Sequence, residues 1–193
     1  MWARIMTASP QGLLEPRPPT ARRVVMPSGE VVVERVIPSS TERANTLKLI
    51  QSARISGFAP LRNVDAVDGG LRVREGYVQG FSLEAAQPRW LSEVSVNLAL
   101  ALVADLSASA HRLHQLDAVQ PIIHGRIDLR HTMLSADGRV WLVGVTGQRG
   151  DPAHDLASLL TLLRALLASR AENPKGAFLL EKLVKLSFND AGA

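Results

Sequence analysis

The sequence predicts an α+β fold in which a small antiparallel sheet with one helix precedes a mainly helical part. Short β-branched runs separated by turn residues fill positions 22–75, as is typical of antiparallel strands. Two leucine-rich segments, 91–116 and 152–169, have the length and composition of helices. Between them, the Asp-Gly pair at 137–138 separates two apolar runs, which favours a β-hairpin.

The composition is that of a globular protein. The chain has 193 residues, of which 46% are hydrophobic and 21% charged, so it can bury a sizeable core. It has no cysteine, which excludes disulfides and thiolate chemistry. The first residues lack the pattern of a secretory signal, and the most apolar window, 94–104, is too short to span a bilayer. We therefore expect a soluble, cytoplasmic protein.

The first part of the chain, residues 1–37, is predicted to form an arm followed by a hairpin. Residues 1–20 contain four prolines, which predicts an irregular arm. The runs 22–26 and 30–37 predict two strands joined by the Pro-Ser-Gly turn at 27–29. Residues 1–62 hold nine Arg or Lys residues against four Glu, so this part of the chain is basic.

One helix follows the hairpin. Ser39 and Glu42 have the spacing of a capping box, which predicts a helix that runs to about Arg54 and is ended by Gly57. The residues expected to face inward are Leu47, Ile50 and Ala53. Two further strands, 61–67 and 71–75, are then predicted.

The second half is predicted to be helical. After a connector at 76–80, a short helix starts at Ser82 and is stopped by Pro88. Segment 91–116 is apolar nearly all round in its middle, which predicts complete burial there. Asp151 followed by proline marks the start of the helix at 152–169. A third helix is expected at 174–186.

The strand after the Asp-Gly turn carries a tryptophan. By alternation, Val140 and Leu142 should point inward and Trp141 outward. An exposed tryptophan is a good anchor for a protein partner. Alternatively, Trp90, the N-terminal arm or another loop covers it.

Four segments together resemble bacterial protein kinases of the eukaryotic Ser/Thr type. They are the catalytic-loop-like stretch at 122–145 (IIHGRIDLRHTMLSADGRVWLVGV), the strand 29–36 (GEVVVERV), the hinge 77–83 (YVQGFSL) and the helix start 155–159 (DLASL). The resemblance implies a two-lobed fold, whose kinase plan has five strands and one helix in its first lobe. It divides the chain into an arm at 1–20, an N-lobe at 21–77 and a truncated, mainly helical C-lobe at 78–193.

The residues that carry out catalysis in kinases differ here. The resemblance aligns Arg35 with the lysine of the third kinase strand and Arg126 with the catalytic aspartate. Asp128 and His131 stand where kinases have the loop lysine and the metal-holding asparagine. Gly144 stands at the aspartate of the D-F-G triplet. There is no Gly-rich loop, so the resemblance implies a degenerate pseudokinase without catalytic residues, metal or cofactor.

Other positions of the motif are kept. His124 and Asp155 match the structural histidine and the helix aspartate that hydrogen-bonds the catalytic loop. We also expect an internal ion pair between Arg126 and Asp128, which would replace metal and nucleotide. Lys48 or Leu49 falls where the kinase helix has its glutamate.

These observations predict a protein-binding scaffold or regulatory subunit of a bacterial complex, with Trp141, Arg22 and Arg23 among its contact residues. ATP is not expected to bind. Two alternatives stay open: a nucleotide-responsive switch or low-activity kinase, and a basic module that binds nucleic acid or an anionic membrane through residues 1–62. The histidines in the second half, His111, His114, His124 and His131, lack cysteine or a Glu-x-x-His pattern, so zinc is not expected.

Overall fold

The computed structural model describes residues 21–90 and 95–168, and the side chains of 87–90 are not described. The N-terminal arm, the predicted helix at 174–186 and Trp90 as a cover for Trp141 therefore lie outside the described part. Within the described residues, none of the helices has the length and apolar character that spanning a bilayer requires.

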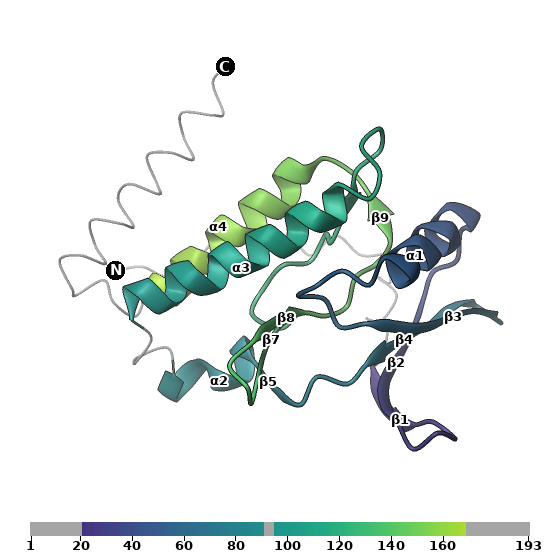
Figure 1. Ribbon diagram of the computed structural model, residues 1–193, viewed down its shortest axis with the longest axis horizontal. Coiled ribbons are helices and arrows are strands. Elements are labelled where there is room, and N and C mark those ends of the chain that lie inside the picture. Colours follow the sequence, from purple (N-terminus) through teal and green to yellow (C-terminus); the bar gives the residue numbers. More distant parts are fainter. Residues whose placement is uncertain (1–20, 91–94, 169–193) are drawn as a thin grey trace, which may run out of the picture.

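A four-stranded antiparallel sheet forms from the first part of the described chain (Figure 1). Its strands are β1 (Arg22–Val25), β2 (Val31–Ile37), β3 (Leu61–Val67) and β4 (Gly70–Gly76), in the order β1-β2-β4-β3. The predicted hairpin at 22–37 is confirmed, and so are the two further predicted strands, which pair with each other as β3 and β4. The kinase plan has five strands in this lobe, and the described residues contain four of them.

Helix α1 (Thr41–Ala53) crosses from β2 to β3. Its N-cap is Ser40, whose hydroxyl accepts a hydrogen bond from the backbone N–H of Arg43 at 3.1 Å. The predicted capping box based on Ser39 is therefore wrong by one residue. Two adjacent serines offer the same capping chemistry, and Ser40 stands directly before the first helical residue, Thr41, with an extended backbone.

Helix α1 ends close to Arg54, as predicted, but the residue that ends it differs from the prediction. Arg54 takes the left-handed conformation (φ 47°) and ends the helix before Gly57. Ala53, the last helical residue, is exposed rather than buried. The residues that α1 buries are Thr46, Leu47 and Ile50.

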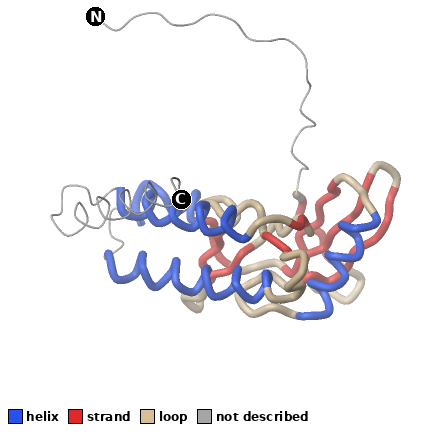
Figure 2. Tube along the Cα trace, turned by 90° about the horizontal axis from the view of Figure 1, so that it is seen from above, coloured by secondary structure: helices blue, strands red, loops and turns tan. Residues whose placement is uncertain are grey.

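The rest of the described chain consists of helices and short strands. They are β5 (Gly80–Ser82), α2 (Leu83–Trp90), α3 (Val96–His114), β6 (Ile122–Ile123), β7 (Thr132–Ser135), β8 (Val140–Leu142), β9 (Gln148–Arg149) and α4 (Pro152–Ala168). The predicted Asp-Gly hairpin is β7–β8, which β5 extends to three strands. Seen from above, α3 and α4 lie together on one side and the sheet with α1 on the other (Figure 2).

Two helix predictions need correction. Helix α2 continues past Pro88 to Trp90, because a proline in the last turn removes one backbone hydrogen bond without stopping so short a helix. Helix α3 is buried on one face only: Leu98 and Leu100 are 42% and 40% exposed. Apolar composition alone cannot tell how many neighbours surround a helix, and α3 packs mainly against α4, β6 and β8.

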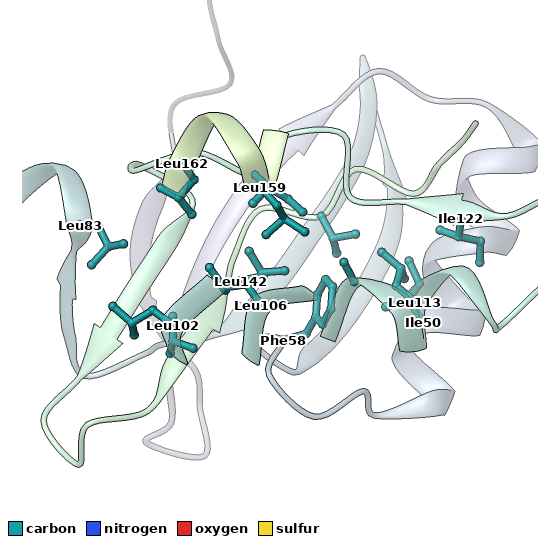
Figure 3. Packing of buried hydrophobic residues seen from close by; sticks show 14 of the residues in the cluster. Ile50, Phe58, Leu83, Leu102, Leu106, Leu113, Ile122, Leu142, Leu159 and Leu162 are labelled. Carbon is teal, nitrogen blue, oxygen red and sulfur yellow. The ribbon is translucent and has the colours of Figure 1, made fainter. Parts of the chain in front are cut away.

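The core runs continuously from the sheet into the helical part. Side chains from α1, α3, α4 and β8 meet around Phe58 and Leu142 (Figure 3). The backbone joins the two parts at the same place, since Leu142 donates to the carbonyl of Gly57 (2.7 Å) and accepts from the N–H of Ala59 (2.9 Å). This junction fixes the position of the sheet over the loop that follows α3.

Replacing Gly57 by alanine is expected to lower the free energy of unfolding by about 3 kcal/mol. Gly57 has φ 85°, which costs an alanine roughly 1–2 kcal/mol, and an added Cβ would lie 2.0 Å from Oγ of Ser109 on α3. Gly29→Ala is the matched control, because Gly29 has φ 82° but open space around it. Urea denaturation should show the larger loss for Gly57→Ala; equal losses would contradict the close packing.

Candidate functional site: the cavity between sheet and loop

A cavity of about 620 Å³ lies between the sheet and the segment 126–148. Its walls come from β2, β4, the loop before β7 and the segment after β8. Four of the five degenerate kinase positions line it: Arg35, Arg126, His131 and Gly144. The structure thus brings these residues together around one space.

A buried ion pair closes the back of this cavity. Nη2 of Arg35 on β2 lies 2.7 Å from Oε1 of Glu75 on β4, and it also donates to the carbonyl of Val145. The second carboxylate oxygen of Glu75 accepts the backbone N–H of Gly144 at 3.0 Å. Both side chains are buried. One carboxylate therefore joins two strands and the segment after β8.

Sequence reasoning missed Glu75. A signal existed, because Glu75 continues the buried face of Leu71 and Val73 along β4, where a charge needs a partner. That partner, Arg35, lies 40 residues away in the sequence. Position 48–49 on α1, which the resemblance aligned with the kinase glutamate, is exposed.

Gly144 has no room for a side chain. Its backbone has φ 83°, and an added Cβ would lie 2.7 Å from Cδ2 of His131. An aspartate at this position would need both the His131 ring and the backbone to move. The N–H of Gly144 is already bound to Glu75. The local geometry is thus built around glycine.

The predicted ion pair between Arg126 and Asp128 is wrong. Oδ1 of Asp128 accepts the backbone N–H groups of Arg130 and His131, each at 2.9 Å, and lies 2.8 Å from Nδ1 of His131. Burial raises the pKa of Asp128, but the hydrogen bonds from His131 and Arg130 outweigh it and hold the pKa below its ordinary value. Arg126 is exposed on the cavity wall, and its guanidinium has no partner among the described residues.

Asp155 fixes the backbone of residues 124–125, which directly precede the cavity-lining Arg126. Its carboxylate is fully buried and accepts the backbone N–H groups of His124 (2.8 Å) and Gly125 (2.9 Å). Nε2 of His114 lies 3.0 Å from the same carboxylate. Three donors from two segments therefore converge on one side chain of α4, and the two backbone hydrogen bonds are of the kind that the resemblance implies for Asp155.

His124 is also fully buried. Its Nδ1 accepts the N–H of Arg126, which leaves Nε2 to donate to the carbonyl of Val143 at 3.1 Å. Burial, only partly offset by Asp155, lowers the pKa of His124 to about 4. The ring is neutral at neutral pH and connects the loop to the segment after β8.

Lowering the pH from 6.5 to 4 is expected to remove about 3 kcal/mol of stability through His124 alone. The unfolded chain binds a proton near pH 6.5 and the folded chain only near pH 4. The stabilisation is therefore complete above pH 6.5 and falls through this window. Urea denaturation of wild type and His124→Gln between pH 7 and 4.5 checks this. The variant should show a flatter pH dependence, and parallel curves would contradict the shifted pKa.

The segment after β8 is short and fixed. Strand β9 pairs with β6, and Nη1 of Arg149 lies 2.6 Å from Oδ2 of Asp117. An added Cβ at Gly147 would lie 2.7 Å from Cγ of Leu47, so this segment packs directly on α1. Helix α4 then begins at Pro152, as predicted, with Asp151 accepting the N–H of Ala153.

The three predicted partner-binding residues all have contacts within the chain. Arg22 bonds to the buried Glu34 at 2.6 Å, and Arg23 stacks over the ring of Tyr77 at 4.4 Å from its centre. Trp141 is half-buried, with Nε1 donating to Oγ of Ser135 at 3.0 Å. Trp141 therefore lies along the hairpin and does not project fully into solvent.

The histidines do not form a metal site in the described part of the chain. There, no three His, Asp or Glu side chains lie close enough together to hold a metal ion. The rings of His124 and His131 are 6.4 Å apart and in an edge-on arrangement.

Comparison with known proteins shows the fold. No protein-family model matches the chain, and no curated protein sequence does. Among the many solved structures that match, one is the pseudokinase domain of BIR2, an immune regulator of the RLK/Pelle family, with a TM-score of 0.52. The match covers 77% of this chain and 45% of that chain at 16% identity. The chain has a protein kinase-like fold.

At 16% identity the likeness concerns the fold alone, and the match spans less than half of the BIR2 chain. The small antiparallel sheet with one helix agrees with a kinase-like fold.

Proposed function

We propose that this chain is a pseudokinase module with a two-lobed kinase-like fold, which transfers no phosphate and acts by binding another protein in a bacterial complex. The observation that supports it most is the buried contact of Arg35, Glu75 and Gly144. Glu75 is the one carboxylate among the described cavity-lining residues, and it is already bound by a guanidinium and a backbone N–H.

Electrostatics disfavour a metal–nucleotide complex in this cavity. Two like unit charges ~4 Å apart repel by about 4 kcal/mol at an effective dielectric of ~20, and Mg²⁺ is doubly charged. Arg126 presents a positive charge where the kinase resemblance has an aspartate. Since about 1.4 kcal/mol of barrier slows a reaction tenfold, a repulsion of about 4 kcal/mol would slow phosphoryl transfer roughly a thousandfold.

The BIR2 domain is itself a pseudokinase, which is consistent with this proposal without extending it to this chain. A protein-binding role then rests on surface residues. The groove beside Trp141, which Pro60, Arg62 and Tyr77 also line, is the face we propose for a partner. Arg22 and Arg23 lie on β1, an edge strand of the four-stranded sheet.

The alternative of a nucleic-acid or membrane site on residues 1–62 has less support. Glu34 accepts hydrogen bonds from Arg22 and Arg74, and Arg72 lies 3.8 Å away. The hydrogen bond from Arg22 lowers the pKa of Glu34 below its ordinary value and outweighs the opposing effect of burial. This carboxylate therefore stays charged among the arginines. Of these three arginines only Arg22 belongs to residues 1–62, so Glu34 partly neutralises one basic side chain of that segment.

Incubation with labelled ATP and Mg²⁺ or Mn²⁺ tests the lack of catalysis. We expect no label on the chain or on a general acceptor protein. Transfer that is abolished by Arg35→Ala would sink the proposal. For the binding role, a protein captured from the native cell by wild type should be lost with Trp141→Ser and kept with Arg139→Ala, a change to an exposed hairpin residue.

A further inference from the structure

The groove beside Trp141 continues past this side chain into a second hollow. The second hollow, of about 470 Å³, lies between the end of α1, the loop that leads to β3 and Trp141. Pro60, Arg62 and Trp141 line both hollows, so the two hollows form one groove. The indole N–H is already bound to Oγ of Ser135, which leaves the apolar part of the ring for a ligand.

The second hollow has an ordered apolar lining. Ile50 on α1, Phe58 in the loop and Leu61 on β3 line it, and all three belong to the hydrophobic core. The loop itself is fixed by the backbone hydrogen bonds that join residues 57–59 to Leu142. An apolar side chain placed here would leave water and pack against a surface that is already in position, which favours binding.

The charges on the second hollow are all positive. Its charged lining residues are Arg54 and Arg62, and none of the described residues that line it is acidic. Arg54 is exposed and makes no hydrogen bond or ion pair within the described structure. Arg62 pairs with Glu30 at 2.6 Å, but these side chains are 48% and 41% exposed, and such pairs are weak enough for a ligand to replace. The second hollow thus combines an apolar surface with uncompensated positive charge.

The backbone at Arg54 is unusual for an arginine. With φ 47°, it is the one non-glycine residue within 21–90 and 95–168 that has a positive φ. Glycine is the usual residue at a helix end of this kind, because a side chain is strained there. Strained positions cluster at binding sites, which supports a role for this side chain. A cation at a helix C-terminus also stabilises the helix, so binding and stability have to be measured on the same variant.

We propose that this groove binds a segment of a partner protein in which a large apolar side chain stands directly beside an aspartate or glutamate. The apolar side chain would pack in the second hollow against Trp141, and the carboxylate would pair with Arg54 and Arg62. A guanidinium binds a carboxylate through two parallel hydrogen bonds, which fix the position of the segment and add to its affinity. This inference rests on the proposed protein-binding role and adds the chemistry of the partner to it.

Selection of displayed random peptides against the full chain tests this proposal, with the Trp141→Ser variant as the counter-selection. Peptides that bind the wild type and not this variant should carry an aspartate or glutamate next to leucine, isoleucine, phenylalanine or tryptophan. A synthetic peptide with the most enriched sequence is then titrated by fluorescence anisotropy. Changing its acidic residue to the amide should weaken binding about tenfold, the loss expected for one charged hydrogen bond.

Two arginine variants separate this contact from general charge attraction. Arg54→Ala should weaken binding of the acidic peptide about tenfold, and it should not weaken binding of the amide peptide further, since both changes remove the same interaction. Arg112→Ala is the matched control, because it removes an exposed arginine from the last turn of α3, outside both hollows. It should change affinity less than twofold. Urea denaturation should give similar stabilities for the two variants, since each loses one cation at a helix end.

The outcomes distinguish this inference from the protein-binding role on which it rests. Enriched peptides without acidic residues, or equal effects of Arg54→Ala and Arg112→Ala on affinity, would overturn the inference and leave the partner face at Trp141 in place. Failure to select any peptide whose binding depends on Trp141 would overturn that partner face as well. The absence of phosphate transfer would stand in each of these cases.

Discussion

Replacing Glu75 by glutamine is expected to lower the free energy of unfolding by about 3–5 kcal/mol, the loss typical of a broken buried ion pair. The change leaves the charge of Arg35 buried without a counter-charge. It also puts an amide NH₂ near either the guanidinium or the N–H of Gly144, both of which are donors. Urea denaturation at pH 7 measures the effect.

Glu84→Gln is the matched control. It breaks a pair with Arg130 of the same 2.7 Å length, but at the surface, where such pairs contribute about 0–1 kcal/mol. A double variant, Arg35→Met with Glu75→Leu, should lose less stability than Glu75→Gln, because no charge is left buried. A loss below about 1 kcal/mol for Glu75→Gln would show that the ion pair does not hold the back of the cavity.

Replacing Asp155 by asparagine is expected to cost about 3 kcal/mol, because it leaves a buried hydrogen-bond donor without an acceptor. The buried carboxylate accepts three hydrogen bonds, from His124, Gly125 and His114. An asparagine has one acceptor oxygen, so its NH₂ must face at least one of these donors. Amide hydrogen exchange at His124 and Gly125 should accelerate together with the loss of stability.

Asp151→Asn makes the same chemical change four residues earlier. Asp151 is exposed and caps the start of α4 through the N–H of Ala153, a role that asparagine fills equally well. We expect a change within about 0.5 kcal/mol. If Asp155→Asn and Asp151→Asn were equally stable, the loop would not depend on the buried carboxylate.

The local elements could be predicted because their signals are local. The turn at 27–29 and the Asp-Gly pair at 137–138 indicated both strand pairs around them, and Asp151 before proline indicated the start of α4. The cap of α1 was misplaced because Ser39 and Ser40 have the same side chain, and only the residue at which the helix begins distinguishes them.

The site was harder to predict, because its contacts join distant residues. Asp128 and Arg126 are close in sequence and opposite in charge. The carboxylate of Asp128 nevertheless accepts hydrogen bonds from the backbone N–H groups of Arg130 and His131 and forms no ion pair with Arg126. The pair that does form, Arg35 with Glu75, depends on β2 and β4 being neighbours in the sheet. Burial of α3 depends in the same way on which elements cover it, so the exposure of Leu98 could not be read from its composition.

The kinase resemblance supplied the frame for residues 122–145, and the fold comparison supports that frame. It could not supply Glu75, since this residue lies outside the four segments that carry the resemblance. The cavity follows from the side chains that surround Glu75, and it therefore became visible only in three dimensions.

Electron paramagnetic resonance of Mn²⁺ tests most directly whether the cavity has lost its metal site. The chain is mixed with Mn²⁺ and a non-hydrolysable ATP analogue, and the spectrum is compared with that of the metal–nucleotide complex alone. Since the one carboxylate among the described lining residues is bound by Arg35 and Gly144, the two spectra should be the same. A stoichiometric protein-bound Mn²⁺ signal that disappears on Glu75→Gln would contradict the proposal that this cavity holds no metal–nucleotide complex.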